Sequence, residues 1–492
     1  MSKAPAFYLG DCCAINAASR TAALHLPAHH LVTHGVVVGM TGSGKTGLVT
    51  VVVEEALRTG VPVLMIDVKG DLPNLFLSFA DSDPSRFVPW VNGMLAPGDE
   101  RSVLEVARSL AEERRQALES WDLGGDAARR FSEQRALRLI TPGSSAGESL
   151  HVLSALERST ERWQRDPDAA RSALSAAISL VLRLVGRDAD AARSREHVLL
   201  SVLAERRLTL GEAADLAALL ADLETLPISE IGALKVERYL PKKERQALAA
   251  ALNNLLASPT FAAWRQGVTL DVGDWLTARP AEDGSLTRTP GVIVSVAHLD
   301  DEERGLVLGV LLEEVLTWVR GLSGSRKLQA LIVFDEVYGF LPPHPANPPT
   351  KRPLVALMKQ ARAFGVGVLV ATQNPMDLDY RTLGNAGLWC IGRLQTDADR
   401  ARVIDGLAQG DRDLDLLLDK TVQRITPRWF VLRDVHAGPN PVLLQPRHAL
   451  SFLRGPMTRQ EMQRAVGLWS NSEAGERQAM TSRAGSATKV TS

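Results

Sequence analysis

The chain has 492 residues, of which 45% are hydrophobic and 23% charged, the composition of an ordinary globular protein with room for two or three domains or for one core with a large insertion. Its formal net charge of -1 excludes a global basic field, so a nucleic acid would bind at a local patch or in a pore assembled from several copies. The three cysteines, Cys12, Cys13 and Cys390, form no C-x-x-C pattern, which argues against a structural zinc site or a disulfide framework. No stretch has the pattern of a signal peptide or a membrane span, and we expect a cytoplasmic protein.

A short, mixed segment, residues 1–34, precedes the first expected strand. It contains four histidines, which invite a metal interpretation: His25, His29, His30 and His34. Their spacing matches no standard metal site, and no carboxylate or cysteine partner is evident. We expect them instead to be loop residues close to the nucleotide that the next motif would bind.

Residues 39–46, Gly-Met-Thr-Gly-Ser-Gly-Lys-Thr, match the phosphate-loop pattern G-x-x-x-x-G-K-[ST] at every position. A β-branched run at 36–38 predicts a buried strand before the loop, and residues 47–58 predict a helix after it. Backbone N–H groups and the helix dipole bind phosphate at such a junction, whereas the alternative is a glycine-rich turn with an exposed lysine. The expected nucleotide-binding residues are Gly39, Thr41, Gly42, Ser43, Gly44, Lys45, Thr46 and Gly47. Lys45 would reach the β- and γ-phosphates, and Thr46 would hold Mg²⁺.

The next apolar run, residues 61–67, ends in Asp67 and predicts a central parallel strand whose carboxyl end lies at the ligand face. We expect Asp67 to order Mg²⁺ waters or to position the nucleotide. The alternative is that residues 67–71, which include Lys69, form a solvated turn.

From residue 100 to residue 265 the composition changes to alanine, leucine, arginine and glutamate at helical spacing. The segment predicts a mainly helical insertion between residues 35–99 and 266–455 of the core, with one core strand at 137–141. The segment has one dense basic run, for which two interpretations are open: a face that binds nucleic acid, or an ordinary solvated surface. That run consists of Lys235, Arg238, Lys242, Lys243 and Arg245.

An α/β pattern returns after the insertion. Strands are expected at residues 291–297, 330–335, 367–372, 388–394, 429–435 and 442–445, and helices at 301–320 and 351–364. The last part, residues 456–492, predicts a C-terminal helix and a polar tail that is disordered beyond about residue 471.

Hydrolysis of a nucleoside triphosphate needs a phosphate cradle, a metal, a positioned water and positive charge on the transition state. Asp335 ends an apolar strand and would hold the Mg²⁺ shell with Thr46, and Glu336 would polarise the attacking water. Gln373 follows a neighbouring strand and would touch the γ-phosphate or the water. The alternatives are an acidic pair that caps its strand and a glutamine that belongs to a turn.

The transition-state charge calls for an arginine. Arg362, at the end of the helix expected at 351–364, and Arg393, on the strand expected at 388–394, are the candidates. Each is alternatively a surface ion-pair partner. An arginine finger supplied in trans implies a subunit interface at the nucleotide.

These motifs resemble the HerA–FtsK superfamily of ring-forming DNA motors, and specifically the HerA-like helicase and translocase ATPases. The acid-lysine-glycine-acid loop at 67–71 is most similar to a bacterial branch of the family. The resemblance spans roughly residues 31–455, and its most specific part runs from Phe334 to Arg402. The matching segments are GMTGSGKT at 39–46, MIDVKGDL at 65–72, TPGS at 141–144, LIVFDEVYGFLPP at 331–343, KQARAFGVGVLVATQNP at 359–375 and IGRLQTDADRARV at 391–403.

The resemblance implies a RecA-like α/β core with a mainly parallel sheet, a helical insertion, a hexameric ring, and double-stranded DNA in the pore. Archaeal members carry a small β-barrel before the core that helps to dock a partner nuclease. Only about thirty residues precede the core here, which leaves a nuclease or another effector protein as an open partner.

We therefore expect an ATP- and Mg²⁺-dependent ring motor that translocates or unwinds DNA. An ATP-driven ring scaffold that organises or gates an effector protein is the alternative. A conjugation-type coupling ATPase is a third interpretation, and the missing membrane anchor counts against it.

Overall fold

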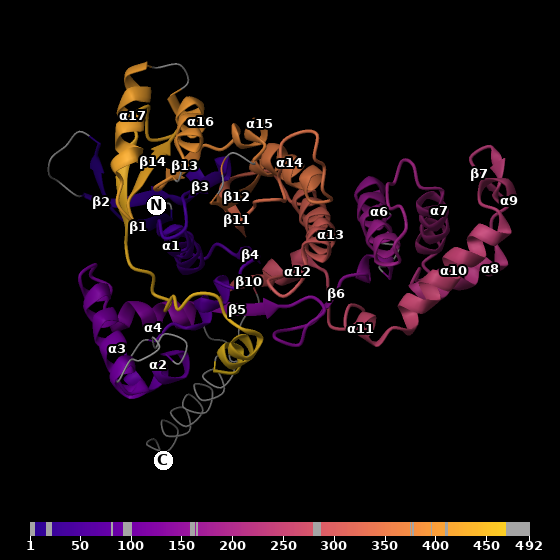
Figure 1. Ribbon diagram of the computed structural model, residues 1–492, viewed down its shortest axis with the longest axis horizontal. Coiled ribbons are helices and arrows are strands. Elements are labelled where there is room, and N and C mark those ends of the chain that lie inside the picture. The colour runs from indigo at the N-terminus through magenta and orange to yellow at the C-terminus, as the bar shows by residue number, and fades with distance from the viewer. Residues whose placement is uncertain are drawn as a thin grey trace, which may run out of the picture.

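The computed structural model describes residues 5–15, 22–79, 82–91, 101–157, 163, 166–278, 287–373, 375, 378–394, 396–408 and 412–468. Its centre is an 11-stranded sheet with the strand order β2-β1-β15-β14-β13-β3-β12-β11-β4-β10-β5. Helices cover both faces, and a group of helices extends away from the sheet at one side (Figure 1).

Neighbouring strands from β13 to β5 all pair in parallel. In chain order they are β3 (Gly35–Val38), β4 (Val63–Asp67), β5 (Arg135–Ile140), β10 (Thr289–Ser295), β11 (Ser325–Asp335), β12 (Phe364–Thr372) and β13 (Leu388–Ile391). The other edge is antiparallel and consists of β1 (Ala6–Ala14), β2 (Ala22–Pro27), β14 (Phe430–Asp434) and β15 (Val442–Pro446). The predicted mainly parallel α/β core is confirmed.

The central strands are apolar throughout because both faces of the sheet are buried. Successive side chains point to opposite faces, so β3 sends Val36 and Val38 into one hydrophobic core and Val37 into the other. Long-range packing of these apolar strands therefore fixes the sheet between two helical layers.

One layer contains α12 (Val272–Leu276), α13 (Asp301–Arg320), α14 (Lys351–Gln360) and α15 (Tyr380–Leu383). The other contains α1 (Lys45–Arg58), α2 (Pro84–Val91), α3 (Val103–Glu119) and α4 (Gly125–Gln134). Helices α16 (Asp397–Ala408) and α17 (Arg412–Arg424) follow β13, and the short 3-10 helices are η1 (Ala28–Thr33), η2 (Leu72–Phe76), η3 (Ser154–Leu156) and η4 (Ala361–Ala363).

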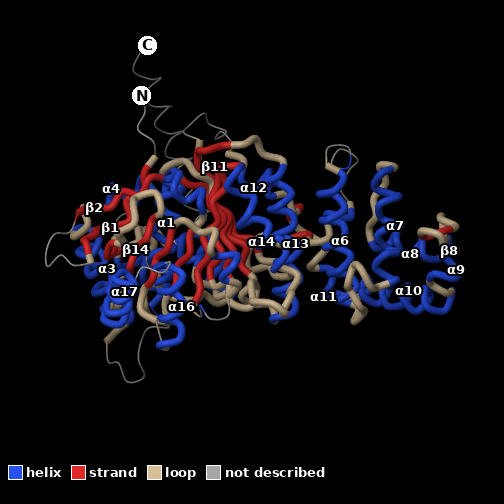
Figure 2. The backbone as a smooth tube through the Cα atoms, turned by 90° about the horizontal axis from the view of Figure 1, so that it is seen from above, coloured by secondary structure: helices blue, strands red, loops and turns tan. Residues whose placement is uncertain are grey.

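The projecting helices form an arm that is joined to the core where α6 packs against α13. Figures 1 and 2 both show α6, α7, α8, α9 and α10 standing away from the sheet, whereas α3 and α4 lie beside it. The arm comprises α6 (Pro167–Leu184), α7 (Arg195–Thr209), α8 (Leu216–Thr225), α9 (Val236–Tyr239), α10 (Lys242–Ala257) and α11 (Pro259–Ala262), with the two-stranded pairs β6 (Leu150–His151) with β9 (Val268–Thr269) and β7 (Glu230–Ile231) with β8 (Leu234–Lys235).

Arg245 departs from the predicted basic face of the insertion. It is 6% exposed and donates to the backbone oxygen of Leu240 at 2.8 Å. Its guanidinium therefore stabilises the start of α10, while Lys235, Lys242 and Lys243 remain exposed.

The N-terminal segment differs from the expectation of a short lead-in, because β1 and β2 extend the sheet. The expected position of its histidines near the nucleotide is wrong. Residues 28–34 precede β3 and lie at its amino end, whereas the phosphate loop follows its carboxyl end. There His30 Nδ1 lies 2.6 Å from Asp434 Oδ2, and the ring of His30 lies 4.7 Å from that of His436.

The helix expected at 351–364 also differs, since α14 ends at Gln360 and Arg362 lies in η4. A helix is present at residues 459–468, and the predicted disordered tail lies outside the described residues. Within the described part of the chain, no helix is both long and apolar enough to cross a bilayer.

Candidate active site

The predicted site residues gather along the side of the sheet where the parallel strands have their carboxyl ends. Parallel strands place all their carboxyl ends at the same edge, which is where open α/β sheets bind ligands. The phosphate loop joins β3 to α1, Asp67 ends β4, Asp335 ends β11, Gln373 follows β12, and Arg393 follows β13 by two residues. Arg362 alone lies at the opposite edge, because η4 leads into the amino end of β12.

The phosphate loop has the backbone that its glycines predict. Gly42 and Gly44 have φ of 79° and 93°, values that favour glycine over other residues. A Cβ atom at Gly39 would lie 2.5 Å from Ser43 Oγ, so this glycine lets the loop close on itself. The buried Ser43 Oγ has no hydrogen-bond partner among the described residues. A buried hydroxyl at the start of a helix is suited to donate to a phosphate oxygen.

Lys45 is the first residue of α1 and is only 6% exposed. Burial lowers the pKa of its ammonium, and the nearby carboxylates of Glu336 and Asp335 partly oppose that shift. Lys45 is therefore surrounded by acids at the end of the loop, where a ligand's phosphate charge would meet it.

Asp335 and Thr46 offer the oxygen ligands that Mg²⁺ prefers. Asp335 is 3% exposed, and burial raises the pKa of its carboxyl to about 6, against the opposing effect of Lys45. A buried carboxylate beside a lysine fits one ligand of a cation whose other ligands are a hydroxyl and phosphate oxygens. No cluster of three or more histidine, cysteine or acidic residues suited to a metal occurs within the described chain.

Glu336 follows Asp335 with φ of 63°, an uncommon conformation for a residue other than glycine. The N–H of Val337 donates to Ala371 at 2.9 Å, which holds the turn against β12. Gln373 donates from Nε2 to Glu336 Oε2 at 2.7 Å and from its backbone N–H to Oε1 at 3.1 Å. Thr41 Oγ1 donates to Gln373 Oε1 at 2.6 Å, so one chain of hydrogen bonds joins the phosphate loop to Glu336.

Asp67 is fully buried and its carboxylate is bonded within the protein. Oδ1 accepts from the N–H groups of Gly70 and Asp71 at 2.9 and 3.1 Å, and Oδ2 accepts from Ser295 Oγ at 2.7 Å. Burial raises its pKa to about 6. Asp67 thus shapes the following loop and lies beside Asp335, its partner in register on β11, where its charge acts on the Asp335 carboxyl. Its burial differs from the alternative of a solvated turn, and its expected role towards Mg²⁺ waters or the nucleotide stays a prediction.

That loop brings Lys69 into the site. Lys69 Nζ lies 2.6 Å from Glu336 Oε2, although the two residues are 267 positions apart. Asp71 also faces the site, since burial raises its pKa while the charges of Lys69 and Lys45 oppose the rise. The sequence led us to expect Lys69 only as a charge on a loop. Its contact with Glu336 is not a local pattern, because it forms between the residues that follow two neighbouring strands, β4 and β11.

The two candidate arginines lie at opposite ends of the sheet. The carbonyl oxygen of Arg393 accepts from the N–H of Met40 at 2.8 Å, so Arg393 borders the phosphate loop of its own chain. Arg362 is exposed. Burial lowers the pKa of His34 to about 4, and the charge of Arg362 adds to this shift. Since β12 has 9 residues, its ends lie about 30 Å apart. Arg362 cannot reach the nucleotide site of its own chain.

Arg428, which the sequence did not single out, supports the phosphate loop. Its N–H donates to Ser43 at 2.9 Å, and a Cβ atom at Gly44 would lie 3.1 Å from its Cγ. Its Nη1 lies 2.8 Å from His448 Nε2. Burial and the charge of Arg428 lower the pKa of His448 to about 4, so a neutral imidazole accepts this hydrogen bond near pH 7.

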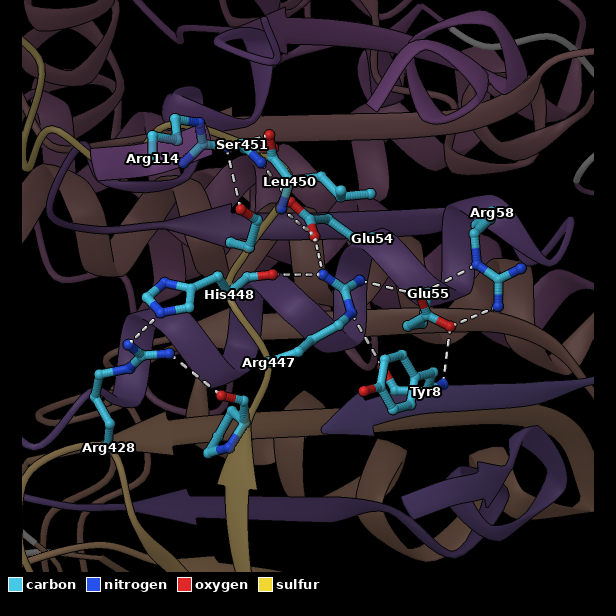
Figure 3. A network of polar contacts seen from close by, with 12 residues as sticks. Tyr8, Glu54, Glu55, Arg58, Arg114, Arg428, Arg447, His448, Leu450 and Ser451 are labelled. Carbon is cyan, nitrogen blue, oxygen red and sulfur yellow. Dashed lines mark hydrogen bonds and ion pairs between the residues drawn. The ribbon is translucent and has the colours of Figure 1, made fainter. Parts of the chain in front are cut away.

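Arg447, next to His448, joins the chain after β15 to α1 (Figure 3). Its guanidinium is fully buried, 3.0 Å from Glu54 Oε2 and 3.0 Å from Glu55 Oε1, and it also donates to the Tyr8 carbonyl oxygen at 3.1 Å. The carboxylate of Glu54 further accepts from the N–H groups of Leu450 and Ser451, each at 2.8 Å. Residues late in the chain therefore anchor α1, the helix that begins in the phosphate loop, near its carboxyl end.

We expect Arg447→Ala to lower the free energy of unfolding by about 3–5 kcal/mol, because it leaves Glu54 buried without its cation and Glu55 with Arg58 as its remaining ion-pair partner. Urea denaturation followed by circular dichroism measures this loss. Arg115→Ala is the matched control, since Arg115 pairs with Glu112 and Glu119 on the exposed surface of α3 and should change stability little. Equal effects of the two substitutions would contradict a structural role for the buried network.

Residues 13–80, which include the phosphate loop and β4, match the family model described as "Helicase HerA-like C-terminal". VirB4 of Thermoanaerobacter pseudethanolicus has a similar fold, with a TM-score of 0.51, 12% identity, and coverage of 91% of this chain and 98% of that chain. The resemblance to HerA-like proteins and the RecA-like core are confirmed.

The bacterial conjugative coupling protein TrwBdeltaN70 gives a TM-score of 0.48 and 14% identity, with 92% of each chain covered. The plasmid coupling protein TrwB in complex with ADP and Mg²⁺ gives a TM-score of 0.46 and 15% identity, with 88% of this chain and 91% of that chain covered. Among curated proteins, none matches the sequence.

Proposed function

We propose that this protein is a cytoplasmic, Mg²⁺-dependent ATPase that assembles as a ring, a hexamer by family resemblance, and moves along or unwinds double-stranded DNA. The single observation that carries the ATPase is the meeting of the phosphate loop, Asp335 and Glu336 at one sheet edge, with Thr41 and Gln373 hydrogen-bonded between them. The three free cysteines agree with a reducing compartment.

In this proposal the backbone of residues 39–47 and the ammonium of Lys45 hold the triphosphate, and Thr46 and Asp335 hold Mg²⁺. A cation held by these two residues would supply positive charge against the triphosphate. Glu336 accepts a proton from the attacking water, and Gln373 orients Glu336 through its amide. Arg393 would stabilise charge within its own subunit.

Two features of the chain favour a ring, the position of Arg362 and the nearly neutral net charge. A head-to-tail assembly places the surface of one subunit against the nucleotide of the next, which gives an arginine far from its own site a role. The chain is nearly neutral overall, so strong DNA binding would need basic loops that converge in the assembled pore. We therefore expect DNA binding to fall steeply with salt and to depend on assembly.

The test is the rate of ATP hydrolysis by full-length protein with and without duplex DNA, on samples sized by light scattering. Lys45→Ala should abolish hydrolysis and weaken nucleotide binding, because it removes the charge against the β- and γ-phosphates. Hydrolysis by Lys45→Ala at the wild-type rate would reject the phosphate-loop assignment.

Hydrolysis without stimulation by DNA would favour the alternative, a ring scaffold that organises an effector protein. Monomers that bind DNA as tightly as rings would reject the pore.

The pKa of Asp335 gives a second expectation. Because burial raises this pKa from 3.8 to about 6, the carboxyl is ionised above that pH and becomes neutral below it. A neutral carboxyl is a poor Mg²⁺ ligand. We therefore expect the Mg²⁺ concentration that gives half-maximal hydrolysis to rise as the pH falls through about 6. Titrations at several pH values, each with a constant concentration of the Mg–ATP complex, measure this change, and a constant half-maximal concentration would contradict it.

A further inference from the structure

Both carboxylate oxygens of Glu336 are engaged by protein donors. Oε2 accepts from Lys69 Nζ at 2.6 Å and from Gln373 Nε2 at 2.7 Å, while Oε1 accepts from the N–H of Gln373 at 3.1 Å and from Thr372 Oγ1 at 3.4 Å. A carboxylate can polarise water only through a free lone pair, and its bond to an ammonium group is a strong, charge-assisted one. In this arrangement Glu336 is therefore held back from the water that it would activate.

Lys69 is the partner that can leave. Its side chain is 37% exposed, whereas that of Glu336 is 11% exposed. The backbone turn at Glu336 is fixed against Ala371, but the four-carbon stem of lysine can swing into solvent. Lys69 also lies close enough to Lys45 to lower the pKa of that lysine, which places it beside the phosphate site. An incoming γ-phosphoryl group would compete with Glu336 for this ammonium.

The end of the chain holds the loop of Lys69 in place. Residues 446–468 are here called the C-terminal segment. This segment begins with the Arg447 network of Figure 3 and continues to the loop of Lys69. The N–H of Met457 donates to the carbonyl oxygen of Gly70 at 2.9 Å, and a Cβ atom at Gly70 would lie 3.3 Å from Met462 Cε. Met457 and Met462 are both buried. The C-terminal segment therefore contacts both sides of the site, the phosphate loop through His448 and Arg428 and the Lys69 loop through Gly70.

We propose that Lys69 is a positioning residue that restrains Glu336, and that the C-terminal segment keeps Lys69 in its restraining position. Hydrolysis then requires Lys69 to release Glu336. The inference rests on the proposed ATPase function and deepens it, since it assigns the step that limits basal hydrolysis.

Lys69→Met tests the restraint in full-length protein without DNA. Loss of one hydrogen bond to a charged group should raise kcat about tenfold, with little change in KM for ATP. Lys69→Arg keeps the cation and should restore a rate close to wild type. Lys351→Met is the matched control, because Lys351 pairs with Asp379 at 3.8 Å away from Glu336. An unchanged or lower kcat in Lys69→Met, or an equal rise in Lys69→Arg, would overturn the restraint.

The C-terminal segment is tested by Met462→Ala, which removes the side chain packed on Gly70 and should raise kcat by a smaller factor. Gln463→Ala is its neighbour in the same helix, where Gln463 bonds to Ser145, and should leave the rate unchanged. No rise in Met462→Ala would overturn the role of this segment.

The wild type and Lys45→Ala separate this inference from the proposed function. If the wild type hydrolyses ATP, Lys45→Ala does not, and Lys69→Met is no faster than the wild type, only the inference fails. If neither the wild type nor Lys69→Met hydrolyses ATP, both fail. Hydrolysis by Lys69→Met alone supports both, because the release of Glu336 would then have exposed the activity.

Discussion

Glu336→Gln is expected to lower the turnover of ATP by about 10²- to 10⁴-fold, the usual contribution of general acid–base catalysis. An amide has the size of the carboxylate but cannot take a proton from water. ATP binding should persist, because Glu336 contacts Lys69, Thr372 and Gln373 and not the backbone N–H groups of the phosphate loop. Single-turnover hydrolysis measures the rate, and titration with a fluorescent ATP analogue measures the affinity.

Glu148→Gln is a suitable control for this experiment. Glu148 forms an ion pair of the same length, 2.6 Å, with Arg138 on β5, the strand at the parallel edge of the sheet. Breaking that pair changes the charge of the protein equally and should leave turnover close to the wild-type value. If ATP affinity in Glu336→Gln falls as far as turnover does, Glu336 is a binding or structural residue and not the base.

The centre of the site could be predicted from sequence because its residues belong to short local patterns. The phosphate loop is a continuous octapeptide, and Asp335 and Glu336 end a conspicuous apolar strand. Parallel pairing then brings these strand ends together without further information. The helical character of residues 100–265 was also predicted from a local signal, an apolar face at helical spacing.

The supports of the site depend on contacts between distant parts of the chain. Arg447 and Glu54 are 393 positions apart, and Lys69 and Glu336 are 267 apart. Strands β1 and β2 have mixed sequences and belong to the sheet through long-range pairing, since β1 pairs with β15 and β2 pairs with β1. The prediction placed His29 and His30 near the nucleotide because they are close in sequence to the phosphate loop. Strand β3 lies between these histidines and the loop, so they are at opposite ends of the strand.

Arg362→Ala is expected to lower hydrolysis by about 10³- to 10⁵-fold, the range measured for arginine fingers, while ATP binding and assembly persist. The 9-residue strand β12 separates Arg362 from Gln373 and the site of its own chain, so in a ring its charge could reach a nucleotide only in a neighbouring subunit. Arg393 would act in its own subunit, since its carbonyl oxygen accepts from Met40 in the phosphate loop. Arg320→Ala is the matched control, because Arg320 is exposed at the end of α13, bonded to Gln360 just before η4.

Mixed rings of Arg362→Ala and Lys45→Ala subunits decide whether the arginine acts in trans. Each variant alone should be almost inactive. In a mixed ring, the Arg362→Ala subunit keeps an intact phosphate loop, and a neighbouring Lys45→Ala subunit supplies Arg362, so some sites are complete and activity returns. An arginine that acted in cis would give no recovery, since every site would lack either its lysine or its arginine. Hydrolysis is measured across mixing ratios on rings shown to be hybrid by mass, and a failure to recover would reject the trans assignment and make Arg393 the next arginine to test.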